Sequence, residues 1–128
     1  MEADINGAQR KVLVSSVAPL KPSHGDSGIA LRNGRTLPFV LRREWSAPAG
    51  HYEETWYLVV PDSREVVFEG SRREVSVWGL QSLTEITDEV VEPITLEPGT
   101  YEIVFSLGSV MGGTLEVEAI AAPEEETT

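Results

Sequence analysis

The chain contains 128 residues, of which 41% are hydrophobic and none is cysteine, and its net charge is −11 at pH 7. A chain of this length forms one domain that buries enough surface to fold without disulfides or metals. The acidic charge repels phosphate backbones and argues against nucleic acid as a partner. No apolar run approaches the roughly 20 residues of a membrane span, which argues against a membrane protein.

Short runs rich in β-branched and aromatic residues follow one another along most of the chain. Prolines, glycines and small polar residues separate these runs, which is the pattern of strands joined by tight turns. We expect eight or nine strands, at residues 11–17, 28–31, 37–45, 52–60, 65–69, 72–78, 80–87, 100–107 and 114–120.

Three turns between these strands have informative sequences. Asn33-Gly34 favours the two positive φ angles of a type I′ hairpin turn. Pro98-Gly99 places proline and glycine where a type II turn needs them, so we expect a tight turn before the strand at residues 100–107. The glycine pair within residues 110–113 predicts one more turn, which would leave the apolar residues beside it exposed at a hairpin tip.

Closely spaced strands without helical periodicity predict an all-β fold, a single-domain antiparallel two-sheet β-sandwich with essentially no helix. Both a jelly-roll and an immunoglobulin-like strand order remain open. We expect a flexible N-terminal segment at residues 1–10, the sandwich at residues 11–121 and a disordered acidic tail at residues 122–128.

The sequence contains no complete catalytic constellation. The tetrapeptide at residues 25–28, Gly-Asp-Ser-Gly, resembles the segment around the nucleophile of trypsin-like serine proteases. A triad in that chain order needs a histidine base and an orienting carboxylate upstream of the serine. The one histidine upstream is His24, immediately adjacent to the tetrapeptide, and the carboxylate before it would be that of Asp4. We therefore predict that the chain is not an enzyme and uses no cofactor.

His24, His51 and Glu53 are the weak candidates for a metal site. Two histidines and one carboxylate can form a facial triad, and His51 and Glu53 would share one face of a strand. An exposed histidine beside a turn is the alternative interpretation of His51. A small metal-dependent jelly-roll enzyme is accordingly the third functional hypothesis, and no metal is expected under the first.

Aromatic residues are the main candidates for a contact surface. Trp56 and Tyr57 are consecutive in one expected strand, so their side chains point to opposite faces and one of them belongs to the core. The expected ligand or partner contacts are Trp45, Tyr52, Tyr57 and Met111, flanked by Arg42 and Arg43. The two arginines belong to a basic segment that either faces an acidic partner or pairs with acidic residues of the same domain.

These observations predict a non-catalytic β-sandwich that works as a protein-interaction or assembly module. A protein partner or self-association is expected, and nucleic acid and membrane are not. A carbohydrate-binding module that uses the same aromatic side chains is the alternative. The lack of cysteine suits a reducing compartment, and we expect a cytoplasmic protein if Met1 is the natural start.

Overall fold

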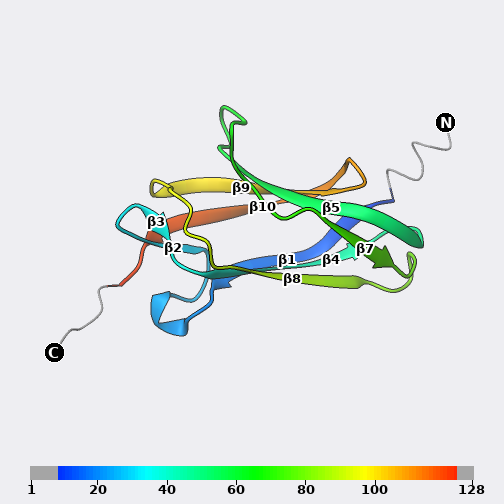
Figure 1. Cartoon of the computed structure of the whole chain (residues 1–128), viewed down its shortest axis with the longest axis horizontal. Helices are drawn as coiled ribbons and strands as arrows, with labels where there is room; N and C mark the ends of the chain where they lie inside the picture. The colour runs from blue at the N-terminus through cyan, green and yellow to red at the C-terminus, as the bar shows by residue number, and fades with distance from the viewer. Residues whose placement is uncertain (1–8, 124–128) are drawn as a thin grey trace.

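The computed structural model describes residues 9–123, and its regular structure is almost entirely β (Figure 1), with 62% of the described residues in strands and no α-helix among them. The ten strands are β1 (Lys11–Pro19), β2 (Ile29–Arg32), β3 (Arg35–Thr36), β4 (Phe39–Ser46), β5 (Gly50–Val59), β6 (Val66–Glu69), β7 (Arg73–Val77), β8 (Thr84–Val90), β9 (Gly99–Leu107) and β10 (Val110–Ala121). One 3-10 turn, η1 (Pro22–His24), follows β1. An isolated bridge between Arg35 and Thr95 adds an eleventh short β segment, so the described residues contain 11 β segments and not the eight or nine expected.

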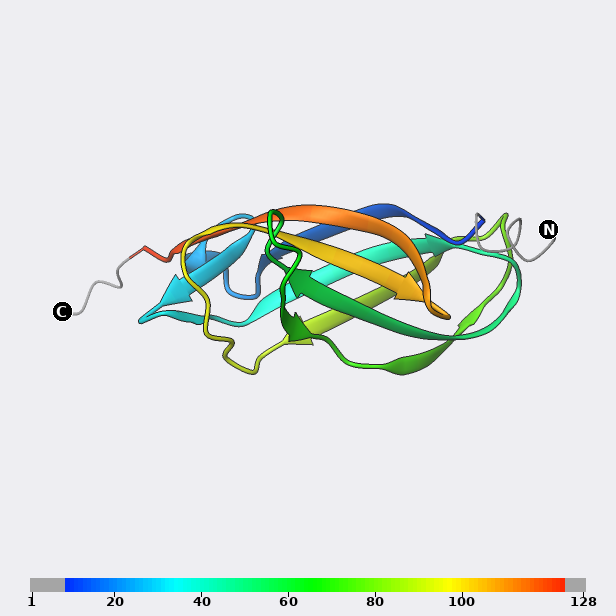
Figure 2. The same ribbon diagram turned by 90° about the horizontal axis from the view of Figure 1, so that it is seen from above.

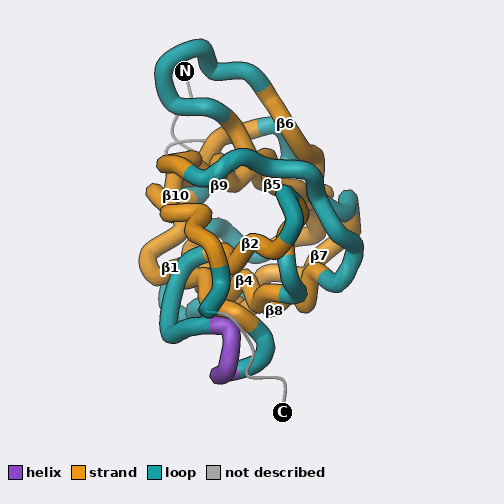
Figure 3. Tube along the Cα trace, turned by 90° about the vertical axis from the view of Figure 1, so that its left-hand side faces the viewer, coloured by secondary structure: helices purple, strands orange, loops and turns teal. Residues whose placement is uncertain are grey.

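The strands form two sheets packed face to face, which confirms the expected sandwich (Figure 3). Sheet A has the order β1-β4-β8, and sheet B has the order β3-β2-β10-β9-β5-β6, with β7 also paired to β5. All strand pairs are antiparallel except β2 with β10, which is parallel. Seen from above, the strands of the two sheets cross at an angle, as twisted sheets do when they pack in an aligned sandwich (Figure 2).

The strand order answers the question that the sequence left open. The orders β1-β4-β8 and β10-β9-β5 correspond to the A-B-E and G-F-C sheets of an immunoglobulin-like sandwich. The Tyr101 hydroxyl, near the start of β9, donates to the carbonyl oxygen of Glu97 at 2.8 Å. A tyrosine that bonds back to the preceding corner in this way is the tyrosine corner of such sandwiches.

Apolar and polar residues alternate along the strands, and the apolar side chains fill the core between the sheets. In β9, Tyr101, Ile103, Phe105 and Leu107 are buried, and the residues between them are only partly covered. β4 shows the same period, with Phe39 and every second residue after it buried. Because successive side chains of a strand point to opposite faces, this period gives each sheet one inward and one outward face.

Two expected turns are wrong. The type II turn expected at Pro98-Gly99 is not formed: Gly99 has a φ of 152° and is already the first residue of β9, and residues 91–98 carry the chain from β8 in sheet A to β9 in sheet B. The last hairpin turns at Gly108 and Ser109, both with positive φ, and β10 already begins at Val110. The turn at Asn33-Gly34 is confirmed, with φ angles of 57° and 75°.

The described strands extend from residue 11 to residue 121. The expected flexible segment and acidic tail fall largely on residues 1–8 and 124–128, which lie outside the described residues. The described residues include no helix of the length and hydrophobicity that crossing a membrane requires.

Candidate functional site

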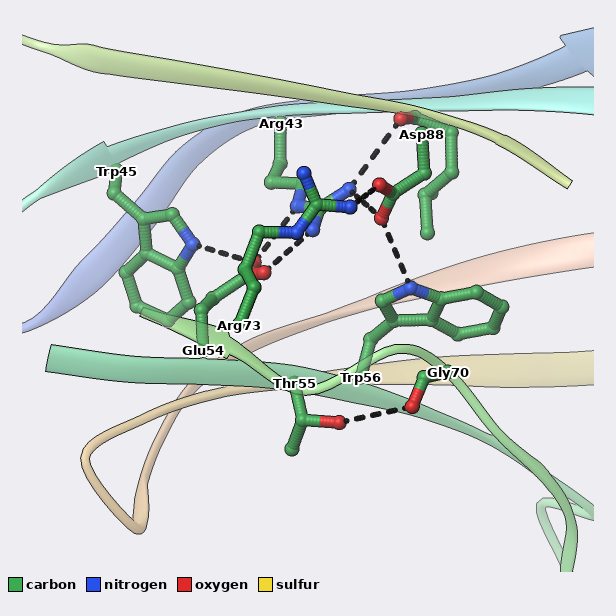
Figure 4. A network of polar contacts seen from close by, with 9 residues as sticks. Arg43, Trp45, Glu54, Thr55, Trp56, Gly70, Arg73 and Asp88 are labelled. Carbon is green, nitrogen blue, oxygen red and sulfur yellow. Dashed lines mark hydrogen bonds and ion pairs between the residues drawn. The ribbon is translucent and has the colours of Figure 1, made fainter. Parts of the chain in front are cut away.

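A group of charged side chains lies buried between the two sheets (Figure 4). Arg43 of β4 and Glu54 of β5 are both fully buried. Nη2 of Arg43 donates to Oε1 of Glu54 at 2.6 Å, and Nε donates to Oε2 at 2.8 Å. The two parallel hydrogen bonds make a bidentate pair that joins sheet A to sheet B.

Asp88 of β8 extends this buried pair into a network. Nη1 of Arg43 donates to Oδ2 of Asp88 at 2.9 Å, and the indole nitrogen of Trp56 donates to the same oxygen at 3.2 Å. Arg73 of β7 forms an ion pair with Oδ1 of Asp88. On the other side, the indole nitrogen of Trp45 donates to Oε2 of Glu54 at 3.0 Å.

The network has the properties of a structural tie between the sheets. Both carboxylates are satisfied by arginine and indole donors, as buried charges must be. Arg43 and Glu54 are closed to solvent, so neither can exchange a proton with a substrate in the folded state. The arrangement therefore explains how four strands, β4, β5, β7 and β8, are held together.

This burial shows that the prediction is wrong for two of the expected contact residues. Trp45 and Arg43 are fully buried, so neither can touch a partner of the folded domain. The reason is the period of β4, which turns Leu41, Arg43 and Trp45 toward the core and Arg42 toward solvent. The burial of Arg43 could have been inferred from the sequence, because apolar residues stand two positions before it and two positions after it.

The remaining expected contacts do not share one surface. Arg42 lies on the outer face of sheet A and pairs with Glu44 and Glu85. The hydrogen bond that Arg42 donates to Glu85 is the largest of the effects that raise the pKa of the Arg42 guanidinium. Tyr52 is half-buried, and its hydroxyl donates to the carbonyl oxygen of Pro48 at 2.7 Å.

Tyr57 and Met111 do come together, in a groove on the outer face of sheet B. The groove has a volume of about 360 Å³, and its lining also includes Glu53, Arg72 and Val104. A second hollow of about 230 Å³ shares Tyr57 and Val104 with it. The ring of Tyr57 therefore lies between the two shallow hollows. Met111, which lines the first of them, is 60% exposed.

The three candidate metal ligands do not form a site. His24 lies in η1 at one end of β4, and His51 lies near the start of β5 at the other end (Figure 1). β4 has 8 residues, which separates the two ends by roughly 25 Å at about 3.3 Å per residue. Glu53 pairs with Arg72 at 3.3 Å, and no metal-binding group of three such side chains exists among residues 9–123.

The loop between β7 and β8 exposes apolar side chains that the sequence prediction left out of its contact set. Trp78 is 78% exposed, and Leu80 and Leu83 are each 45% exposed. We refer to these three residues as the loop cluster. The loop lies at the same end of the sandwich as the turns that join β4 to β5 and β9 to β10 (Figure 1). The exposure of Trp78 could have been inferred from the sequence, because Trp78 stands at the end of its expected strand and is followed by Gly79.

No protein family and no curated protein matches the sequence. Among solved structures, the chain is similar to a β-glucosidase from Listeria innocua, with a TM-score of 0.47, 14% identity, and coverage of 85% of this chain but 16% of that one. It is also similar to an alkylpurine DNA glycosylase from Pseudomonas fluorescens bound to DNA with an abasic site analog, with a TM-score of 0.47, 15% identity, and coverage of 89% and 31%. The chain spans less than a third of the length of either protein, and neither similarity carries an argument about activity.

Proposed function

We propose that this chain is a non-catalytic protein-interaction or assembly module and that it contacts its partner through the loop cluster. The observation that supports the proposal is the 78% exposure of Trp78 beside two further exposed leucines in one short loop. Tryptophan contributes more than most residues to the free energy of binding at protein interfaces. Three exposed apolar side chains within six residues of a small domain support a contact with another molecule.

The position of the loop cluster favours an interaction role as well. In immunoglobulin-like sandwiches the loops gather at the two ends, where they can vary without disturbing the packed sheets. The loop cluster lies at one of these ends, the same end as the turn at Gly108 and Ser109 (Figure 1). The buried ion pair between Arg43 and Glu54 joins the two sheets that carry these loops.

A carbohydrate-binding module is the alternative, and the arrangement of the aromatic residues favours it less. Trp45 and Trp56 are buried and their indole nitrogens are bonded within the core. Tyr57 lies in the groove beside Glu53, where a sugar ring could stack, but Trp78 belongs to a different region. A titration with soluble glycans, followed by tryptophan emission and by the backbone shift of Tyr57, tests this alternative.

Sedimentation equilibrium at low and high salt tests whether the partner is a second copy of the chain. The comparison is between the natural sequence and a variant that carries Trp78→Ser, Leu80→Ser and Leu83→Ser. A dimer that persists at high salt and dissociates in the variant would identify self-assembly through the loop cluster. A dimer that the variant leaves intact would contradict the assignment of the contact to this loop.

A further inference from the structure

The longest strand described, β10, has one edge that is mostly unpaired. β9 pairs with one side of β10 along nearly its whole length. β2 pairs with the other side only at residues 119–121. β1 runs beside this side of β10, but in residues 9–123 no backbone pairing joins the two strands. A Cβ atom at Gly112 would lie 3.0 Å from the carbonyl oxygen of Arg10, and one at Gly113 would lie 3.7 Å from that of Val12, so β1 covers the edge there. Residues 114–117 form the open part of the edge, which is a template for another strand.

The backbone groups that face this open edge can be identified. The amide of Ala122, just beyond β10, donates to the carbonyl oxygen of Leu31 in the β2 segment at 2.8 Å. Because successive residues of a strand point their backbone groups to opposite sides, the even-numbered residues before Ala122 face the same side. Thr114 and Glu116 thus direct their amides and carbonyls outward, and neither has a backbone partner on that side within the described residues.

Gly28 marks where the open edge ends. It packs against the backbone of Glu118 so closely that a Cβ atom at Gly28 would lie 2.6 Å from the carbonyl oxygen of Glu118. Its own amide donates to the carbonyl oxygen of Val17 at 3.0 Å. The available edge therefore lies before Glu118.

A groove of about 510 Å³ lies along this edge, between β10 and β1. Leu115 and Val117 of β10 and Val17 of β1 supply apolar lining. Glu116 and Glu118 lie at alternate positions of β10 and are exposed. An added strand would find apolar side chains on one face and carboxylates on the other.

The two carboxylates lack a positive partner in the described part of the chain. No ion pair involves Glu116 or Glu118, and the one hydrogen bond to Glu118 comes from the hydroxyl of Thr100. Glu102, on the neighbouring strand, is by contrast paired with Arg64. The outward face of the open edge is thus negatively charged.

This charge argues against a second copy of the chain as the occupant. Antiparallel pairing of two β10 edges would place Glu116 and Glu118 of one copy next to the same residues of the other. Like charges opposite each other destabilise a strand pair. Positively charged side chains of an added strand, placed opposite Glu116 and Glu118, would instead stabilise the pairing.

We propose that the open edge of β10 binds an extended segment of a partner protein in which basic and apolar residues alternate. The segment adds a strand to sheet B, bonds to the backbone of Thr114 and Glu116, and places its apolar residues over Leu115 and Val117. Strand addition takes its affinity from backbone hydrogen bonds and its specificity from alternate side chains. This site is separate from the loop cluster and goes beyond the proposed function.

Amide hydrogen exchange on the full chain tests the proposal, with an acetylated and amidated peptide of alternating lysine and valine as the probe. The amides of Thr114 and Glu116 should exchange fast in the free protein and at least about tenfold more slowly with the peptide bound, as pairing protects edge amides. The amides of Leu115 and Val117 already bond to β9 and should change little. A peptide of alternating glutamate and valine should protect neither pair.

Three controls separate the outcomes. The same lysine peptide with methylated backbone amides should not bind, since it keeps the charge and loses the donors. The variant Glu116→Lys with Glu118→Lys should prefer the glutamate peptide, whereas Glu74→Lys, on β7, and Trp78→Ser should leave binding unchanged. Equal binding of the two unmethylated peptides, or protection of Thr114 and Glu116 by self-association without peptide, would overturn the proposal.

Discussion

Arg43 and Glu54 join the two sheets through two hydrogen bonds of 2.6 and 2.8 Å, with both side chains fully buried. They lie on β4 of sheet A and β5 of sheet B, which are consecutive in the chain. Burial strengthens the attraction between them and raises the cost of losing either one. The pair therefore ties the sheets together in one relative position.

Replacing Glu54 by leucine should lower the free energy of unfolding by roughly 3–5 kcal/mol, because Arg43 would keep its charge in the core with fewer partners. The double variant Arg43→Met with Glu54→Leu should lose less than the single variant, since no charge would be left unpaired by the second change. Urea unfolding followed by circular dichroism measures both values. Glu74→Leu, at an exposed position, is the control, and a loss below about 1 kcal/mol for Glu54→Leu would contradict the account.

Gly112→Ala should destabilise the domain through Trp45. A Cβ atom at Gly112 would lie 2.2 Å from Cζ3 of the Trp45 ring, which is far closer than contact distance. Overpacking of this kind typically costs about 1–3 kcal/mol. The cost should shrink in a Trp45→Phe background, because phenylalanine lacks the outer ring atoms. Equal costs in the two backgrounds, from urea unfolding, would show that the contact is not the cause.

Tyr101→Phe should cost about 0.5–1.5 kcal/mol, the usual value of one hydrogen bond, by removing the bond to Glu97. Tyr52→Phe should cost a similar amount, because its hydroxyl bonds to Pro48 in the same way. Tyr57→Phe is the matched control, since Tyr57 lies on the outer face and its ring can keep its contacts. Thermal unfolding should rank Tyr57→Phe as the mildest of the three, and the reverse order would contradict the assigned corner.

Acrylamide should quench one of the three tryptophans far more than the others. Trp78 is 78% exposed, whereas Trp45 and Trp56 are buried. The quenchable part of the emission should therefore disappear in Trp78→Phe and persist in a Leu80→Ser control. An accessible component that remains in Trp78→Phe would show that a core tryptophan reaches solvent.

The period of the strands made the sandwich predictable from the sequence. Runs of β-branched and aromatic residues between turn residues predicted strands in the segments that became β4 and β9, and apolar residues alternate with polar ones in both. The same rule, applied strictly, places Arg43 between Leu41 and Trp45 and so predicts its burial. The sequence prediction put Arg43 on the surface because charged residues are rarely buried, and a buried pair is visible only when the partner strand is known.

The turns were harder to predict because glycine serves more than one purpose. Gly112 and Gly113 were expected to turn the chain, but Gly112 leaves room for Trp45, and the turn falls on Gly108 and Ser109. Crossing from sheet A to sheet B at residues 91–98 depends on the strand order, which local sequence does not encode. The open edge of β10 was equally invisible, since it follows from which strand fails to pair.

Photo-cross-linking tests the interaction role most directly. Benzoylphenylalanine is placed at position 78 in the loop cluster and, as a control, at position 91, where Val91 is 62% exposed at the far end of β8. The two proteins are irradiated in extract of the native cell. The account predicts a discrete cross-linked protein, or a cross-linked dimer of the chain, from position 78 and not from position 91. Equal and diffuse products from the two positions, or none from either, would contradict it.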